Sequence, residues 1–454
     1  MKVLTAFLIA FLFAVSLCAQ PKSVILEKYI SEGLQNNLSL HTQQVDIQKA
    51  TLALEQAQAL FMPTVNFVTQ YTLAAGGRRT DLPVGDLLNP VYNTLNQLTH
   101  SASFPTIDNQ QINFLPTNFD DIKLHTVYPI LNSDLKYNRE IRKELINGKQ
   151  IEINVYRREL VKQIKTAYIQ YCQANQAVEI YRNALALTKE NQRVNEKLVA
   201  NNVATKIVVV RSQHEVSKVE TALFETQTSM KNAAAYFNFL LNKVLDNPIE
   251  IDPAILDGVQ NQANLIASVG DGFVQKREEI AQLQSGIKTT DLQLKMNESY
   301  KTPKIGASLD VGFQGYGFQI WNKQAYALLG VQLELPVYNA NSNKMKARQT
   351  KFDLDKLQHQ LSEAESQLKL QAETIKNTLT YAVHSLQSNE AELASAREYY
   401  RLTDKRYKEG QALLIELIDA RTQMTNAELK ENLTQYSILL KQVELERVLA
   451  SYQL

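Results

Sequence analysis

The sequence predicts a mainly helical protein with a pair of membrane β-hairpins, arranged as a two-half internal repeat of long coiled-coil helices and four strands. The first observation is where helix breakers are missing. Proline is absent from Ile130 to Asn247 and after Val337, and glycine is absent from Lys149 to Asp257. These stretches are rich in good helix formers. A continuous helix from about Ser133 to Val199 would be roughly 100 Å long, at about 1.5 Å per residue.

Heptad seams explain how such long helices are stabilised. Apolar residues alternately four and three apart pack against neighbouring helices as a coiled coil. The first seam consists of Leu160, Ile164, Ala167, Tyr171, Ala174, Val178, Tyr181 and Leu185. The second lies 208 residues later and consists of Leu368, Ala372, Ile375, Leu379, Ala382, Leu386 and Leu393, with the polar Asn389 opposite Tyr181. The common offset predicts two related halves.

The repeat sets the expected domain boundaries. We expect a first repeat at 20–247, which begins with a helix and contains a strand hairpin at 63–129 and a long helical hairpin at 133–243. A linker at 248–270 precedes a second repeat at 271–454. That repeat also begins with a helix and contains a strand hairpin at 303–336 and a long helical hairpin at 340–452.

Four segments between the helices alternate apolar and polar residues. Their apolar positions are Val65, Phe67, Tyr71 and Leu73; Ile122, Leu124 and Tyr128; Ile305, Ala307, Leu309, Val311 and Phe313; and Leu329, Val331, Leu333 and Leu335. Each segment has about ten residues, the length of a membrane strand. A soluble sheet gives the same alternation, but no apolar element remains to cover one. Because the smallest membrane barrels have about eight strands, four strands require the chain to oligomerise.

The two strand hairpins have different loops. Residues from about Gly76 to Phe119 are expected to form a long polar loop, whereas the loop from Gly315 to Gln324 is short. Tyr316, Phe318 and Trp321 cluster in the short loop with Tyr326. They suit an aromatic girdle at the membrane surface, and ordinary turn packing is the alternative.

The N-terminus predicts export from the cytoplasm. Lys2 is followed by an apolar run, and a small residue, Ala19, precedes Gln20. This pattern indicates a secretory signal peptide at 1–19; a short membrane anchor or lipid attachment at Cys18 are the alternatives. Without Cys18, Cys172 is a lone thiol with no partner for an internal disulfide.

Composition and motifs exclude several functions. The 48 basic and 47 acidic residues leave a net charge of +1, so no basic excess indicates nucleic acid binding. The six histidines show no metal-ligand spacing, and no phosphate-binding loop or nucleophile motif is present. We therefore expect no catalytic residue, cofactor or metal, and energy for any transport must come from a partner.

The ordered, duplicated layout resembles the TolC-like outer membrane efflux family over about Val24 to Tyr452. The motifs that carry the resemblance are Phe61-Met-Pro, Leu335-Pro-Val-Tyr, Asn202-Val-Ala-Thr-Lys and Gly410-Gln-Ala-Leu-Leu-Ile-Glu-Leu-Ile-Asp-Ala-Arg. The resemblance implies a homotrimer with a twelve-stranded β-barrel in outer-membrane lipid and a helical tunnel in the periplasm of a Gram-negative bacterium. It places the linker at the equator of the tunnel. It also implies a periplasmic adaptor and an inner-membrane transporter of the RND or ABC type as partners.

Family members turn their long helices at two tips that meet the adaptor. The corresponding residues here are Asn201, Asn202 and Val203 at the first tip, and Tyr407, Gly410 and Gln411 at the second. Asn202 and Gly410 tolerate left-handed backbone and are expected to make the turns. Stopping the helices is the alternative role.

Acidic residues just after the second tip ring the periplasmic aperture in the family. Glu416 and Asp419 are three residues apart and share a helix face. Three copies would place six carboxylates around one opening, which favours cations. A solvated helix face is the alternative.

Departures from the family put its closing mechanism in doubt. Family members close the aperture partly through an acidic residue and an arginine, and Val208 and Ala412 stand at those positions. Tyr407 keeps the family's tyrosine. A different lock is expected, for which Arg406 and Arg211 are candidates.

The leading functional hypothesis is the outer-membrane channel of a tripartite export system that passes drugs, ions or other substrates. One alternative is the exit duct of a type I protein-secretion system. Another is a periplasmic coiled-coil adaptor or scaffold, although an adaptor would have one helical hairpin rather than two.

Overall fold

The computed structural model describes residues 23–114, 118–257, 259, 271–316 and 324–454. The predicted signal peptide with Cys18, and part of the predicted linker, lie outside these residues. Contacts divide the chain into two compact units. Unit 1 comprises the described residues of Met1–Thr51, Glu144–Thr290 and Phe352–Leu454, and unit 2 comprises those of Leu52–Lys143 and Asp291–Lys351.

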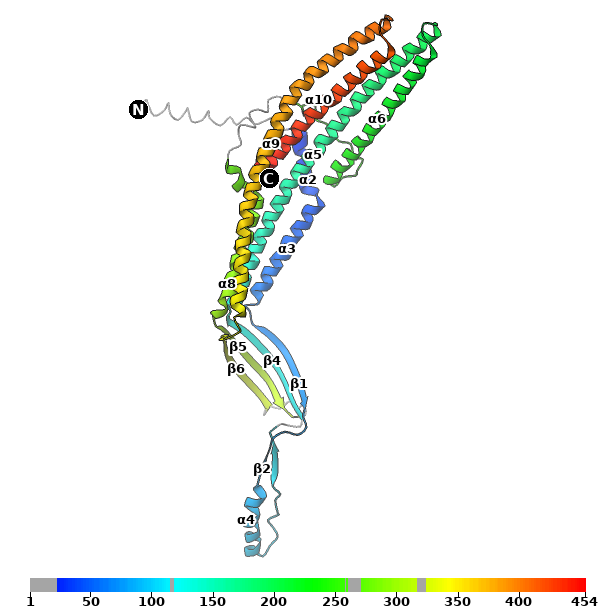
Figure 1. Ribbon diagram of the computed structural model, residues 1–454. Coiled ribbons are helices and arrows are strands. Elements are labelled where there is room, and N and C mark those ends of the chain that lie inside the picture. Colours follow the sequence, from blue (N-terminus) through cyan, green and yellow to red (C-terminus); the bar gives the residue numbers. More distant parts are fainter. Residues whose placement is uncertain (1–22, 115–117, 258, 260–270, 317–323) are drawn as a thin grey trace, which may run out of the picture. The chain divides into compact units, whose positions relative to one another are not determined.

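The described chain has eight α-helices, which Figure 1 labels; α4 (Val84–Thr99) is described below with the segment after the first strand, and the other seven follow here. They are α2 (Val24–Asn36), α3 (Leu38–Ala59), α5 (Ser133–Ala200), α6 (Lys206–Leu240), α8 (Glu278–Glu298), α9 (Ser342–Lys408) and α10 (Leu414–Leu449). The predicted long helices are present, because α5 has 68 residues and α9 has 67. Two short 3-10 helices, η2 (Asp271–Lys276) and η3 (Ser299–Lys301), flank α8. Among the residues described, no helix is both long and apolar enough to cross a membrane.

In unit 1 the predicted α9 seam is buried, whereas the predicted α5 seam is buried at four positions and half-buried at Tyr171, Ala174, Tyr181 and Leu185. On α5, Leu160 and Ile164 are fully buried with Tyr168 and Phe237 in one cluster. All seven apolar members of the α9 seam are buried, and most pack with Ile438 of α10 in a second cluster. Full burial of one large apolar side chain contributes about 1.5–3 kcal/mol, so these seams stabilise the long helices. The polar seam member Asn389 donates Nδ2–H to Thr434 Oγ1 at 2.8 Å.

Unit 2 contains a four-stranded antiparallel sheet in the order β1-β4-β5-β6 (Figure 1). The strands are β1 (Thr64–Leu73), β4 (Asn118–Leu131), β5 (Lys304–Gly315) and β6 (Ala325–Glu334). The registers Phe67↔Leu124, Leu124↔Val311 and Val311↔Ala327 align the apolar residues on one face. The predicted fold class of long helices with four strands is confirmed. Within the described chain, β1 and β6 each pair with only one strand.

The segment after β1 differs from the expected polar loop. It contains β2 (Arg79–Leu82), β3 (Gln110–Asn113) and the 16-residue helix α4 (Val84–Thr99). Pro90 lies inside α4, and the loop prediction relied on such prolines. The helix forms because its apolar residues recur every three or four positions and side chains bind the segment that follows it.

Candidate functional site at the helical turns

The two helical hairpins of unit 1 turn by the same backbone device. Asn202 has φ 57° and Gly410 has φ 74°. Each residue's N–H donates to a carbonyl three residues earlier at 3.0 Å, and the next residue's N–H donates to a carbonyl five residues earlier. This pattern is a Schellman motif, which ends a helix at a left-handed residue. Asn201, Val203 and Gln411 are exposed beside the turns.

The turn after α9 leads to two exposed carboxylates at the start of α10. Glu416 Oε2 accepts the backbone N–H of Leu413 at 3.0 Å, so this side chain satisfies a free donor at the helix start. Asp419 Oδ2 accepts an N–H of Gln423 at 2.8 Å. Both side chains lie at the surface one turn apart. The pair therefore places two negative charges on one exposed face.

Next to the turns, buried polar side chains join the first helical hairpin (α5 and α6) to the second (α9 and α10). Arg421 of α10 is 4 % exposed and donates to Glu215 Oε2 of α6 at 2.9 Å. Its other terminal nitrogen donates to Thr188 Oγ1 of α5. Tyr407 of α9 donates to Asn195 Oδ1 of α5.

Asn195 extends the contact with Tyr407 to a third helix, because its Nδ2 donates to Ser212 Oγ of α6 at 2.5 Å. Burial raises the pKa of the Tyr407 hydroxyl, which keeps it protonated and able to donate. We call the six residues the interhairpin polar network; they are Thr188, Asn195, Ser212, Glu215, Tyr407 and Arg421. Buried polar networks fix one register of packed helices because every alternative leaves a polar group unpaired.

Tyr407 was expected from the sequence as a tip residue, and none of the other five members of this network was predicted. Arg406, one of the candidates for the lock, donates to the carbonyl of Gln411 at 3.1 Å, within its own turn. The sequence signal that could have found Arg421 is a charged residue at a position of α10 where the apolar spacing calls for an apolar one. Arg421 lies between the buried Leu417 and Met424, with four-then-three spacing.

The polar face of the sheet carries a second group of paired charges. Lys123 Nζ lies 3.0 Å from Asp121 Oδ2 and 3.1 Å from Asp310 Oδ2. His125 Nδ1 lies 2.5 Å from Asp310 Oδ1, and the Tyr326 hydroxyl donates to Asp121 Oδ1 at 2.7 Å. Tyr326 therefore belongs to the polar face of the sheet and not with the aromatic residues of the short loop. Tyr316 is exposed, and Phe318 and Trp321 lie outside the described residues.

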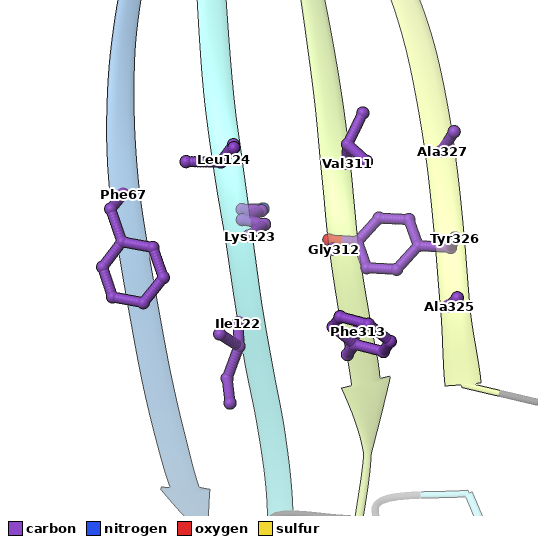
Figure 2. Close-up of a pocket in the computed structure, with 10 residues that line it drawn as sticks. All are labelled: Phe67, Ile122, Lys123, Leu124, Val311, Gly312, Phe313, Ala325, Tyr326 and Ala327. Atoms are coloured by element: carbon purple, nitrogen blue, oxygen red, sulfur yellow. The ribbon is translucent and has the colours of Figure 1, made fainter. Parts of the chain in front are cut away.

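The opposite face of the sheet is apolar and exposed. Phe67 is 69 % exposed, Leu329 72 % and Val331 70 %. A hollow of about 530 Å³ lies in the sheet, and Figure 2 shows its lining residues. Seven of the ten belong to the apolar face: Phe67, Ile122, Leu124, Val311, Phe313, Ala325 and Ala327. A soluble domain would cover such a surface.

Comparisons with known proteins agree with this architecture. Residues 273–451 match the family model described as outer membrane efflux protein. No curated protein matches the sequence. The fold is similar to that of the outer-membrane channel OprN, at 15 % identity and a TM-score of 0.75, covering 94 % of this chain and 90 % of that chain.

Two further solved structures share the fold. The outer membrane protein VceC from Vibrio cholerae is 15 % identical, with a TM-score of 0.73 over 93 % of this chain and 95 % of that chain. The Campylobacter jejuni CmeC outer membrane channel is 13 % identical, with a TM-score of 0.74 over 94 % of this chain and 85 % of that chain. At these identities the likeness establishes the fold.

Proposed function

We propose that this chain, which has the fold of TolC-like outer membrane factors and an outer membrane efflux protein domain at residues 273–451, is the exit duct of a tripartite export system. An inner-membrane RND or ABC transporter and a periplasmic adaptor would deliver drugs, ions or other substrates to it. The observation that carries the proposal is the four-stranded sheet, which has one exposed apolar face and, among the described residues, two edge strands that each pair with one neighbour.

The sheet supports a trimer in outer-membrane lipid. Backbone groups at an open strand edge cannot stay unpaired in hydrocarbon, so β1 of one copy would pair with β6 of the next. Three copies supply twelve strands, above the minimum of about eight for a membrane barrel. The apolar face would then meet lipid, and Lys123, Asp310 and their partners would line the lumen. Most of the chain would lie in the periplasm.

The turns support a periplasmic aperture and adaptor contacts. Glu416 and Asp419 would form a ring of six carboxylates that favours cations. Asn201, Asn202, Val203 and Gln411 would meet the adaptor, since they are exposed at the turns and Val203 is 72 % exposed. The interhairpin polar network would hold the second hairpin, and hence the acidic pair, in position. It would replace the lock lost with Val208 and Ala412.

Membrane fractionation with gel analysis tests the function. We expect the chain in the outer membrane as a trimer that dissociates on heating, and we expect ion channels when the trimer is added to a lipid bilayer. A monomer in the soluble periplasmic fraction would contradict the proposal and favour an adaptor.

Ion selectivity tests the acidic ring. The double variant Glu416→Gln and Asp419→Gln removes the charge, and glutamine at 416 can still accept the N–H of Leu413. We expect the reversal potential in a salt gradient to lose its cation preference. Glu363→Gln, at an exposed α9 position, is the control and should keep it. Unchanged selectivity in the double variant would exclude this ring as the filter.

A further inference from the structure

The described residues between β1 and β4 form a folded element of their own. It consists of β2, α4, an extended segment and β3, with β2 and β3 paired antiparallel from Arg79↔Asn113 to Leu82↔Gln110. Because it leaves the end of β1 and returns at the start of β4, it lies beyond that end of the sheet (Figure 1).

One face of α4 is held by its own chain. Asn89 donates to the carbonyl of Ile107 at 2.9 Å and accepts its N–H at 2.8 Å. Asn96, two turns later, makes the same pair of bonds with Phe104 at 2.9 and 3.1 Å. A Cβ atom at Gly85 would lie 2.3 Å from the Ile107 carbonyl oxygen, so glycine permits this close approach. These contacts fix which sides of α4 remain exposed.

A second face of α4 is apolar and exposed. Leu87 is 70 % exposed, Val91 52 % and Leu98 73 %. Their spacing, with Thr94 between Val91 and Leu98, is the four-and-three pattern of a coiled-coil seam. Asp86 is the one charged residue in α4. Surface helices normally carry many charges, so this composition marks an interaction surface rather than a solvated one.

We propose that the Leu87–Val91–Leu98 stripe packs against the same stripe of neighbouring copies, so that three α4 helices meet over the outer mouth of the duct. The inference rests on the proposed function, because the trimer would bring all three stripes to the same level beyond the strand ends. A heptad-spaced apolar stripe can pack against an identical stripe in symmetric copies.

Charge argues against a lipid surface as the occupant. Helices that lie on anionic membranes are rich in lysine and arginine. No lysine or arginine occurs from Leu82 to Asn118, where Asp86 and Asp108 are acidic. When the uncharged stripe packs between copies, the segment does not have to lie against negatively charged lipid phosphates. The contact would narrow the outer end of the duct with side chains that offer no binding charge to a passing substrate.

Cysteine cross-linking in outer-membrane vesicles tests the contact. Cys172 is buried, so a short thiol-specific cross-linker should leave the unmodified chain monomeric on a heated gel. Val91→Cys and Leu98→Cys should give covalent dimers. Asn93→Cys and Gln97→Cys are the matched controls, because they lie on the other exposed side of α4. They should give several-fold less dimer.

The unheated gel separates this inference from the function on which it depends. A heat-labile trimer in which Val91→Cys and Leu98→Cys cross-link no better than Asn93→Cys would overturn the α4 contact and leave the duct intact. Absence of any trimer would overturn both. Reaction of Val91→Cys with a maleimide-headgroup lipid, without dimer formation, would identify a membrane-surface helix and also overturn the inference.

Discussion

Arg421 has a buried position and two partners from another helical hairpin. Removing one partner of a buried ion pair costs about 3–5 kcal/mol, because the other charge is left without compensation. We therefore expect Arg421→Met to lower the temperature at which the detergent-solubilised trimer loses its helical circular dichroism. We also expect larger single-channel conductance, because the second hairpin would lose its anchor near the aperture.

Two further variants distinguish loss of the buried ion pair from general disruption of packing at Arg421. Arg421→Met with Glu215→Leu should recover much of the loss, since no unpaired charge remains. Arg193→Met removes an exposed ion pair with Glu190 on the same helix and should change little. If the double variant is as unstable as Arg421→Met, the ion pair is not the cause.

Glu279 gives unit 1 a pH-dependent stability. Burial opposes its charge, but hydrogen bonds from Arg277 and Arg447 prevail and lower its pKa to about 2. Because the folded-state pKa is below the usual 4.5, the stabilisation is complete above about pH 4.5 and is lost as pH falls toward 2. Glu279→Gln should thus be less stable than the parent at pH 7, by on the order of 3 kcal/mol. The two melting temperatures should converge near pH 2; a constant difference would contradict the prediction.

At the scale of single elements, β5 contains three glycines, and two of them, Gly306 and Gly312, have different surroundings. A Cβ at Gly312 would lie 2.2 Å from the Ile122 carbonyl oxygen and 2.7 Å from the Lys123 Cα, both on β4. A Cβ at Gly306 would meet its nearest atom, the Tyr128 carbonyl oxygen, at 3.8 Å. We expect Gly312→Ala to force β4 and β5 apart and to reduce the yield of heat-labile trimer. Gly306→Ala, the control, should assemble normally; equal yields would show that the strands adjust.

For the whole molecule, the two faces of the sheet should respond differently to added charge. Leu329 is on the apolar face of β6, and Gln332 is on the polar face of the same strand. An arginine on the lipid side of a barrel costs about 2–4 kcal/mol at the membrane midplane. We expect Leu329→Arg to reduce the amount of chain recovered in the outer membrane and Gln332→Arg to leave it unchanged. Equal recovery of both variants would contradict the assigned lipid face.

The elements follow from local sequence rules. The absence of proline and glycine, together with the heptad seams, predicted α5 and α9. The alternation of apolar and polar residues predicted β1, β4, β5 and β6. The positive φ at Asn202 and Gly410 was expected because both residue types tolerate left-handed backbone. The helix α4 was missed because Pro90 and several polar residues outweighed its three-and-four spacing.

The sequence by itself determined the repeat, the long helices and the four strands, because periodicity and breaker placement depend only on neighbours along the chain. Tertiary structure alone decided the strand order β1-β4-β5-β6 and the partners of Arg421 and Tyr407. It also decided that Asn89 and Asn96 bind the chain beyond α4 and leave Leu87, Val91 and Leu98 exposed. Such contacts join residues distant in the chain, such as Glu215 and Arg421, and no local pattern specifies which side chains will meet.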